Sequence, residues 1–275
     1  MRIDAHQHFW LLENRRGSWP PAELAAIHRD FLPPDLAPVL AAHGVVGTVV
    51  VQSLPSIDDT LFMLRQAEAT DFILGVVGWV DLKSPNAVRD IALLAGDPKL
   101  KGLRPMLQDL EDDNWIDDPL LTPAIEAMIS HGLVLDALVL PRHLPALLAF
   151  AERFPTLPIV IDHAAKPDIA AGRMAPWQDD IARLARLPNV HCKLSGMVTE
   201  ARPGWQIAEL RPYADHLLAQ FGARRLIWGS DWPVLNLAAD YGRWIAASEA
   251  LLAALDEVSL RAVFGANAQK FYRLG

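Results

Sequence analysis

The chain has 275 residues, of which 52% are hydrophobic and 21% charged, and its formal net charge is −8. This composition is typical of a globular protein and excludes a disordered chain. The acidic balance and the lack of a basic cluster argue against nucleic acid or an anionic membrane as the main partner. Cys192 is the one cysteine, so an intrachain disulfide is excluded. Because a strand is expected from the first residues, we expect no signal peptide. No apolar run is long enough to span a bilayer. We therefore expect a cytoplasmic protein.

Short apolar segments rich in β-branched residues recur along the chain, and segments of helix length separate them. Near-continuous hydrophobicity without alternation suits parallel strands that are covered on both faces. We predict eight strands, over Ile3–His6, Val46–Gln52, Ile73–Val80, Lys101–Met106, Val134–Leu138, Pro158–His163, Asn189–Ser195 and Leu226–Asp231.

The segments between these strands carry apolar residues at three- and four-residue spacing, which indicates amphipathic helices. Ser56 is a candidate N-cap with Asp59 at the capping-box position, and Gly44 suits the position after a helix end. The alternation predicts an α/β fold, a single distorted (β/α)8 barrel over residues 1–275. An open doubly wound sheet is the alternative, but it usually has fewer strands, and no phosphate-binding glycine motif is found.

Two long segments interrupt the regular alternation. One covers residues 9–34 after the first strand, and the other is "LQDLEDDNWIDDP" after the fourth. Both follow the carboxyl end of a strand, where barrel enzymes build their pockets. We expect these long loops to shape a substrate pocket.

Four chelating side chains are expected at strand ends: His6, His8, His163 and Asp231. Side chains alternate faces along a strand, so both imidazoles of the His-x-His motif point the same way. Only a closed parallel barrel brings all four together. The set suits one divalent metal ion, best Zn²⁺. The alternative is that the histidines are core residues bonded to carbonyls.

Metal binding is a separate expectation from the site itself. A binuclear centre usually needs a bridging ligand and a further histidine from the fifth strand, where "LVLDAL" offers only Asp136. We therefore predict one metal ion, or none, with the histidines then donating hydrogen bonds to the substrate.

Asp231, in "GSDWP", is the predicted general base, because a carboxylate beside imidazoles or a cation stays ionised and can accept a proton from water. The alternative is a helix N-cap, which Pro233 close behind would suit. Arg104 ends the fourth strand and is predicted to polarise a carbonyl. Its alternative is an ion pair with Asp109 or Asp112.

Further residues near strand ends are predicted to contact substrate, although packing is the competing explanation for each. Lys193 and Ser195 share one face of the seventh strand, while Cys192 lies on the other and is an improbable nucleophile. The predicted substrate contacts are Gln52, Lys193, Ser195, Trp10 and Trp232.

The segments "IDAHQHFW", "RPMLQD", "IDHAAKP", "CKLSGMVTEA", "WGSDWPV" and "FGANAQKFYRL" resemble the amidohydrolase superfamily. Within it, the chain resembles the sugar-lactone hydrolases such as L-fuconolactonase and L-rhamnonolactonase, with 2-pyrone-4,6-dicarboxylate lactonase as a more distant relative. The motifs run from residue 3 to residue 274. The resemblance implies a distorted (β/α)8 barrel. It places the family's strand-end residues at His6, His8, His163 and Asp231, and makes Arg104 a carbonyl or hydroxyl contact.

The resemblance also implies an enzyme of carbohydrate metabolism that opens a sugar-derived lactone to the acid, with His163, Asp231 and Arg104 as catalytic residues. Members of this branch vary in whether they need a metal. The predicted partner is a small sugar lactone, and a homo-oligomer is compatible with this interpretation. Two alternatives remain open: a metal-dependent decarboxylase of the same superfamily, and a non-catalytic barrel that binds sugar acids.

Overall fold

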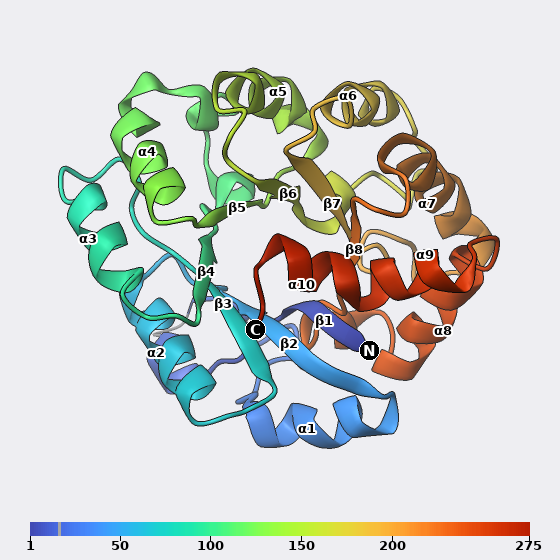
Figure 1. Ribbon diagram of the computed structural model, residues 1–275. Coiled ribbons are helices and arrows are strands. Elements are labelled where there is room, and N and C mark those ends of the chain that lie inside the picture. Colours follow the sequence, from blue (N-terminus) through green and yellow to red (C-terminus); the bar gives the residue numbers. More distant parts are fainter. Residues whose placement is uncertain (16–17) are drawn as a thin grey trace.

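A computed structural model describes residues 1–15 and 18–275. Eight parallel strands form one sheet in the order of the sequence, and helices surround it (Figure 1). The predicted (β/α)8 barrel is therefore confirmed. The strands are β1 (Arg2–Gln7), β2 (Val45–Val51), β3 (Ile73–Gly78), β4 (Leu100–Leu103), β5 (Val134–Ala137), β6 (Ile159–Ile161), β7 (Val190–Leu194) and β8 (Leu226–Trp228).

The barrel is distorted where its first and last strands meet. Neighbouring strands from β1 to β8 pair in parallel ladders, with register shifts among the first four. Between β8 and β1 the link is an isolated bridge of Gln7 with Trp232, just past the end of β8. His8 N donates to Trp232 O at 2.7 Å, and Asp231 N donates to His6 O at 2.8 Å. The seam therefore closes at three of the predicted chelating residues, His6, His8 and Asp231.

The helices follow the strands as expected from the apolar spacing. They are α1 (Pro33–Ala42), α2 (Ile57–Glu68), α3 (Ala87–Leu94), α4 (Thr122–Ser130), α5 (Leu144–Arg153), α6 (Trp177–Leu184), α7 (Ile207–Phe221), α8 (Tyr241–Leu251), α9 (Glu257–Arg261) and α10 (Asn267–Phe271). In Figure 1 α10 (red) crosses the end of the barrel at which both termini lie. None of the described helices combines the length and the apolar character that crossing a membrane requires.

The local helix signals are largely right. Ser56 caps α2, since its side chain accepts a hydrogen bond from Asp58 N. Gly44, just past the end of α1, has a positive φ of 64°, as expected for a residue after a helix end. Asp59 does not complete a capping box. Its carboxylate accepts from Ser53 N and Leu54 N instead, because the chain turns back over the start of α2.

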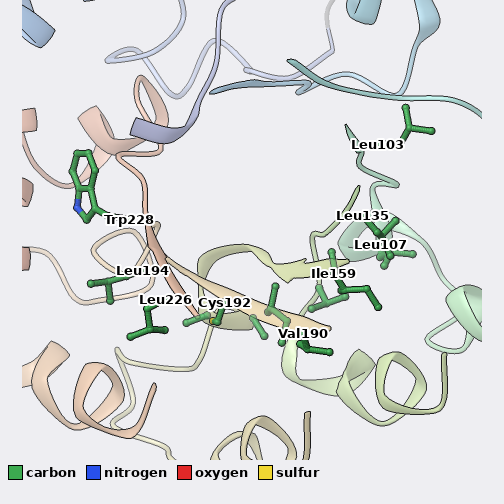
Figure 2. Packing of buried hydrophobic residues seen from close by; sticks show 14 of the residues in the cluster. Leu103, Leu107, Leu135, Ile159, Val190, Cys192, Leu194, Leu226 and Trp228 are labelled. Carbon is green, nitrogen blue, oxygen red and sulfur yellow. The ribbon is translucent and has the colours of Figure 1, made fainter. Parts of the chain in front are cut away.

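Two apolar layers make up the core. The larger lies between the strands and the surrounding helices, and Figure 2 shows part of it, from Leu103 on β4 to Trp228 on β8. Cys192 belongs to this layer and is fully buried, in keeping with an inert thiol. A smaller cluster fills the amino-terminal part of the barrel interior and includes Val49, Ile227 and Tyr272.

Several strands are shorter than predicted, most notably β6 and β8. The predicted strands end at His163 and Asp231, whereas β6 ends at Ile161 and β8 at Trp228. His163 has φ 52° and Asp231 has φ 62°, values in the left-handed region that an extended strand does not adopt. Both residues therefore lie in the loops that follow their strands.

Candidate active site

The four predicted chelating side chains meet at the carboxyl ends of β1, β6 and β8. Asp231 Oδ1 lies 3.2 Å from His8 Nε2, 3.7 Å from His163 Nε2 and 3.8 Å from His6 Nε2. None of the four is more than 5% exposed. One carboxylate oxygen thus faces three imidazole nitrogens in a buried setting.

Hydrogen bonds on the far side of two rings orient them toward this oxygen. His8 Nδ1 lies 2.7 Å from Val51 O, a carbonyl that can only accept, so Nδ1 carries the proton. His163 Nδ1 lies 2.9 Å from Ser195 Oγ. His8 Nε2 then faces the Asp231 carboxylate, and a cation between the two groups would contact both.

This donor set fits a single divalent ion. Ligand atoms bound to a tetrahedral zinc ion at about 2.0–2.1 Å stand about 3.3 Å apart. The separations of 3.2–3.8 Å from Asp231 Oδ1 are close to that value. The ligand atoms of His6, His163 and Asp231 all lie within 4.8 Å of one another. Three of the four predicted ligands, His6, His163 and Asp231, therefore form a group that could hold the ion. His8 Nε2 lies beside them, 3.2 Å from Asp231 Oδ1.

The charge states suit the same role. Burial lowers the pKa of His6 well below its ordinary value, and the nearby Lys193 adds to the effect. Burial also lowers the pKa of His163 to about 4, so both rings are neutral at neutral pH. Burial alone would raise the pKa of Asp231, but His163 and His8 hold it below its ordinary value. The carboxylate is therefore ionised.

The loop after β6 positions His163 through unusual backbone geometry. Four successive residues, His163 to Lys166, have φ between 49° and 61°, a region that costs an L-residue about 1–2 kcal/mol. Trp177 Nε1 donates to Ala164 O at 2.6 Å and holds the turn. Gly196, with φ 61°, lies against the imidazole, and a Cβ there would be 2.4 Å from His163 Nδ1. The ring is therefore packed against a position that only glycine suits.

Asp162 contacts two residues of the site and was not among the predicted site residues. Its Oδ2 accepts from Arg104 Nη1 at 3.2 Å, and its Oδ1 lies 3.3 Å from His6 Nδ1. Burial alone would raise its pKa, but Lys193, His6 and Arg104 lower it well below the ordinary value. Alternation along a strand would point Asp162 away from His163. The left-handed turn removes that alternation, so both side chains reach the site.

Arg104 is at the site, but neither predicted ion pair forms. Its guanidinium pairs with Asp162 instead of Asp109 or Asp112, and its Nη1 lies 3.3 Å from His6 Nε2. The N-cap alternative for Asp231 is also wrong. The short helix that follows is capped at Pro233, and the Asp231 side chain bonds to His8.

Three predicted substrate contacts touch other residues of the site. Lys193 is fully buried and pairs with Asp136 and Asp162, while Ser195 bonds to His163. Gln52 Nε2 donates to Arg104 O at 2.7 Å. All three side chains are fully buried and contact other residues of the site.

The two predicted tryptophan contacts pack in an aromatic cluster. Trp10 is fully buried edge-on against Phe31, and its Nε1 donates to Arg29 O. Trp232 is 4% exposed and lies against Phe9 and Phe31. Neither is among the described residues that line the cavity. Both anchor the loop after β1.

A cavity of about 420 Å³ opens above Asp231. Arg104 and Lys166 place positive charge on its wall, and the two long loops contribute Trp19 and Asp109. A hollow of about 490 Å³ beside α2 includes none of the chelating residues in its described lining. The smaller cavity is therefore the candidate active site, and the long loops do shape it.

Comparison with known proteins agrees with this geometry. Residues 3–274 match the family model described as amidohydrolase. The chain belongs to this family. It is 59% identical to L-fucono-1,5-lactonase of Burkholderia ambifaria, over 99% of this chain and 96% of that protein. It is 37% identical to L-fucono-1,5-lactonase of Burkholderia multivorans, over 100% of this chain and 96% of that protein.

A solved structure supports both the amidohydrolase fold and the metal expectation. An amidohydrolase from Burkholderia multivorans, crystallised with bound zinc, superposes with a TM-score of 0.93. The two chains are 36% identical, and the match covers all of both. The family implied by the sequence motifs is confirmed, and one divalent ion is compatible with the donor set described above.

Proposed function

We propose that this amidohydrolase opens the ring of a sugar-derived lactone to the free sugar acid, with L-fucono-1,5-lactone as the first substrate to test. One observation carries the proposal: a buried, ionised Asp231 faces three imidazole nitrogens beneath a cavity of sugar size. The 59% identity with an L-fucono-1,5-lactonase over nearly the whole chain supports the same substrate class.

Asp231 is the proposed general base. Its carboxylate accepts a proton from a water molecule in the cavity as the water oxygen forms a bond to the lactone carbonyl carbon. The bond from that carbon to the ring oxygen then breaks, and Asp231 returns the proton to the leaving oxygen. The product is a hydroxy acid, which releases one proton to solution at neutral pH.

Positive charge around the cavity stabilises the carbonyl oxygen as it becomes negative. Arg104 and Lys166 are on the cavity wall, and Asp162 holds Arg104 in place. When bound, a divalent ion held by the three histidines and Asp231 supplies Lewis-acid polarisation of a carbonyl oxygen.

Substitution of Asp231 by Asn tests the proposal. The change keeps the size of the side chain and removes the base, so the enzymatic rate should fall by about 10³-fold. The readout is proton release from L-fucono-1,5-lactone with a pH indicator, corrected for spontaneous hydrolysis and repeated with Zn²⁺ and with a chelator. Circular dichroism checks that the variant is folded.

Three other results would contradict the mechanism or favour one of the alternative functions. Wild-type activity in the folded Asp231→Asn variant would contradict the mechanism. Release of CO₂ from an aromatic or unsaturated acid, lost with chelator, would indicate the decarboxylase alternative. Lactone binding without turnover under every metal condition would indicate the non-catalytic barrel.

We further propose that the enzyme works in the cytoplasm as a single domain. The buried, unpaired Cys192 suits a reducing compartment. One eight-stranded sheet includes strands from Arg2 to Trp228, which supports a single domain.

A further inference from the structure

A group of charged side chains lies inside the barrel directly beneath His6. It consists of Lys193, Asp136 and Asp162, and we call it the lysine cluster. All three are 0% exposed. Tyr272, next to α10, donates a hydrogen bond to Asp136 Oδ2 at 2.8 Å and so ties the cluster to the end of the chain. Lys193 and Asp136 have no part in the proposed chemistry, in which Asp162 serves only to hold Arg104.

The Lys193 ammonium occupies the centre of three metal-type ligand atoms. Its Nζ lies 2.5 Å from Asp136 Oδ2, 3.0 Å from Asp162 Oδ1 and 3.1 Å from His6 Nδ1. The ligand atoms of those three residues are all within 4.8 Å of one another. Two carboxylates and an imidazole are a donor set that binds divalent cations. The amine therefore lies where a cation would.

One atom of this set is short of hydrogen bonds. Asp162 Oδ1 is buried and has no hydrogen-bond partner among the described residues, because its contacts with Lys193 and His6 are close but poorly aligned. Removing the ammonium would leave Asp136 and Asp162 buried with Arg104 as their nearest balancing charge. A buried carboxylate pair in that state must take up protons or a cation.

We propose that the Lys193 ammonium occupies a second cation-binding position beneath His6. The site can then bind only one divalent ion, at the position beside Asp231. His6 lies between the two positions, with Nε2 facing Asp231 and Nδ1 facing Lys193. This proposal concerns how many divalent ions the site binds, so it does not depend on which substrate the enzyme uses.

Metal stoichiometry is the direct test. Wild type, Lys193→Ala and Lys193→Ala/Asp136→Asn are saturated with Zn²⁺, freed of excess metal by gel filtration and analysed for zinc per chain. Wild type should hold at most one equivalent. Lys193→Ala should hold about one more than wild type, and the added Asp136→Asn change should remove the extra equivalent. Lys270→Ala, which removes an exposed lysine of α10, should match wild type.

A second pair of variants keeps the test decisive if Lys193→Ala does not fold. Lys193→Met fills the space without charge, so its melting temperature should fall by about 10 °C because buried carboxylates lose their partner. Adding Asp136→Asn should restore most of that loss. Two zinc ions in wild type, no extra zinc in folded Lys193→Ala, or an unchanged melting temperature in Lys193→Met would each overturn the proposal.

Discussion

Single residues of the site depend on burial for their chemistry. Asp231 Oδ1 faces three imidazole nitrogens at 3.2–3.8 Å, and none of these groups is more than 5% exposed. The lowered pKa values of His6 and His163 keep their rings neutral, which is the form that binds a metal ion. Burial opposes ionisation of Asp231, and the contacts with His163 and His8 outweigh it and hold the pKa below its ordinary value.

Asp162 should matter although it does not face the cavity. In Asp162→Asn the buried Arg104 and Lys193 lose a charged partner, and breaking such pairs costs about 3–5 kcal/mol. Because Arg104 also loses its anchor, kcat/KM should fall by about 10²-fold. Denaturant unfolding and steady-state kinetics measure the two effects.

An exposed ion pair provides the control for Asp162. Glu257→Gln removes a carboxylate whose side chain is 81% exposed beside Arg261, and the free energy of unfolding should change by less than about 1 kcal/mol. Equal stability loss in the two variants would contradict the role given to Asp162.

His191 on β7 should make the protein sensitive to acid. Burial lowers its pKa to about 4 from 6.5, and the nearby Arg225 adds to this. The unfolded chain therefore binds a proton near pH 6.5 that the folded chain binds only near pH 4. The stability that neutral His191 provides is present above pH 6.5 and is lost as the pH falls toward 4.

A comparison of His191→Gln with wild type isolates this effect. Between pH 7.5 and 4.5 the difference in unfolding free energy should shift by about 2–3 kcal/mol in favour of the variant. Urea unfolding at the two pH values measures it. The exposed His131→Gln variant should show no such shift, and a shift of the same size there would contradict the assignment.

At the scale of elements, the loops after β6 and β8 decide the site. The sequence pattern extends both strands as far as His163 and Asp231, yet the strands end at Ile161 and Trp228. Hydrophobic periodicity reports which residues are buried, and it does not distinguish an extended residue from a left-handed one. The sequence therefore predicts that the chelating residues lie at the strand ends, but it does not predict their left-handed backbone conformation.

Gly196 offers a test of the loop geometry. In Gly196→Ala the new Cβ would lie 2.4 Å from His163 Nδ1, so the ring must move, and kcat/KM should fall by about 10-fold or more. Gly204→Ala is the matched control, because Gly204 has φ 77° but nothing within 4 Å of the added Cβ.

The control should lose only about 1–2 kcal/mol of stability to backbone strain and keep its kinetics. Thermal unfolding and lactone hydrolysis measure both variants. Unchanged kinetics in Gly196→Ala would show that His163 has room to move.

For the whole molecule, a buried carboxylate adds side-chain hydrogen bonds to the backbone bonds that close the seam between β1 and β8. Asp4 accepts hydrogen bonds from Ser230 N at 2.8 Å, from Ser230 Oγ at 2.5 Å and from Tyr241 OH at 2.9 Å. These contacts join β1 to the segment after β8 and to α8. They close the barrel where no regular ladder does.

Loss of Asp4 should therefore weaken the entire fold. Asp4→Ala leaves several buried donors without an acceptor and should cost about 3–5 kcal/mol, or about 10 °C in melting temperature. Asp4→Asn keeps one oxygen, and the hydroxyls of Ser230 and Tyr241 can rotate to accept from its amide, so its loss should be smaller. Calorimetry compares the two variants, and equal melting temperatures for them would contradict this account.

The sequence by itself determined the barrel, the family and which four side chains meet at Asp231. Alternating strands and helices specify a parallel barrel, and a parallel barrel brings all carboxyl strand ends to one face. His6, His8, His163 and Asp231 were predictable because they lie at or just past the carboxyl ends of three strands, β1, β6 and β8. These four positions can be predicted without knowing which residues contact one another in the fold.

Only the tertiary structure decided how those residues are supported. Lys193 meets Asp136 and Asp162 inside the barrel, and Trp10 meets Phe31 in the loop after β1. These pairings depend on the register of distant strands and on a left-handed turn, which local patterns do not encode. A polar residue at a strand end can face the cavity or the interior, and packing across the whole barrel chooses between them.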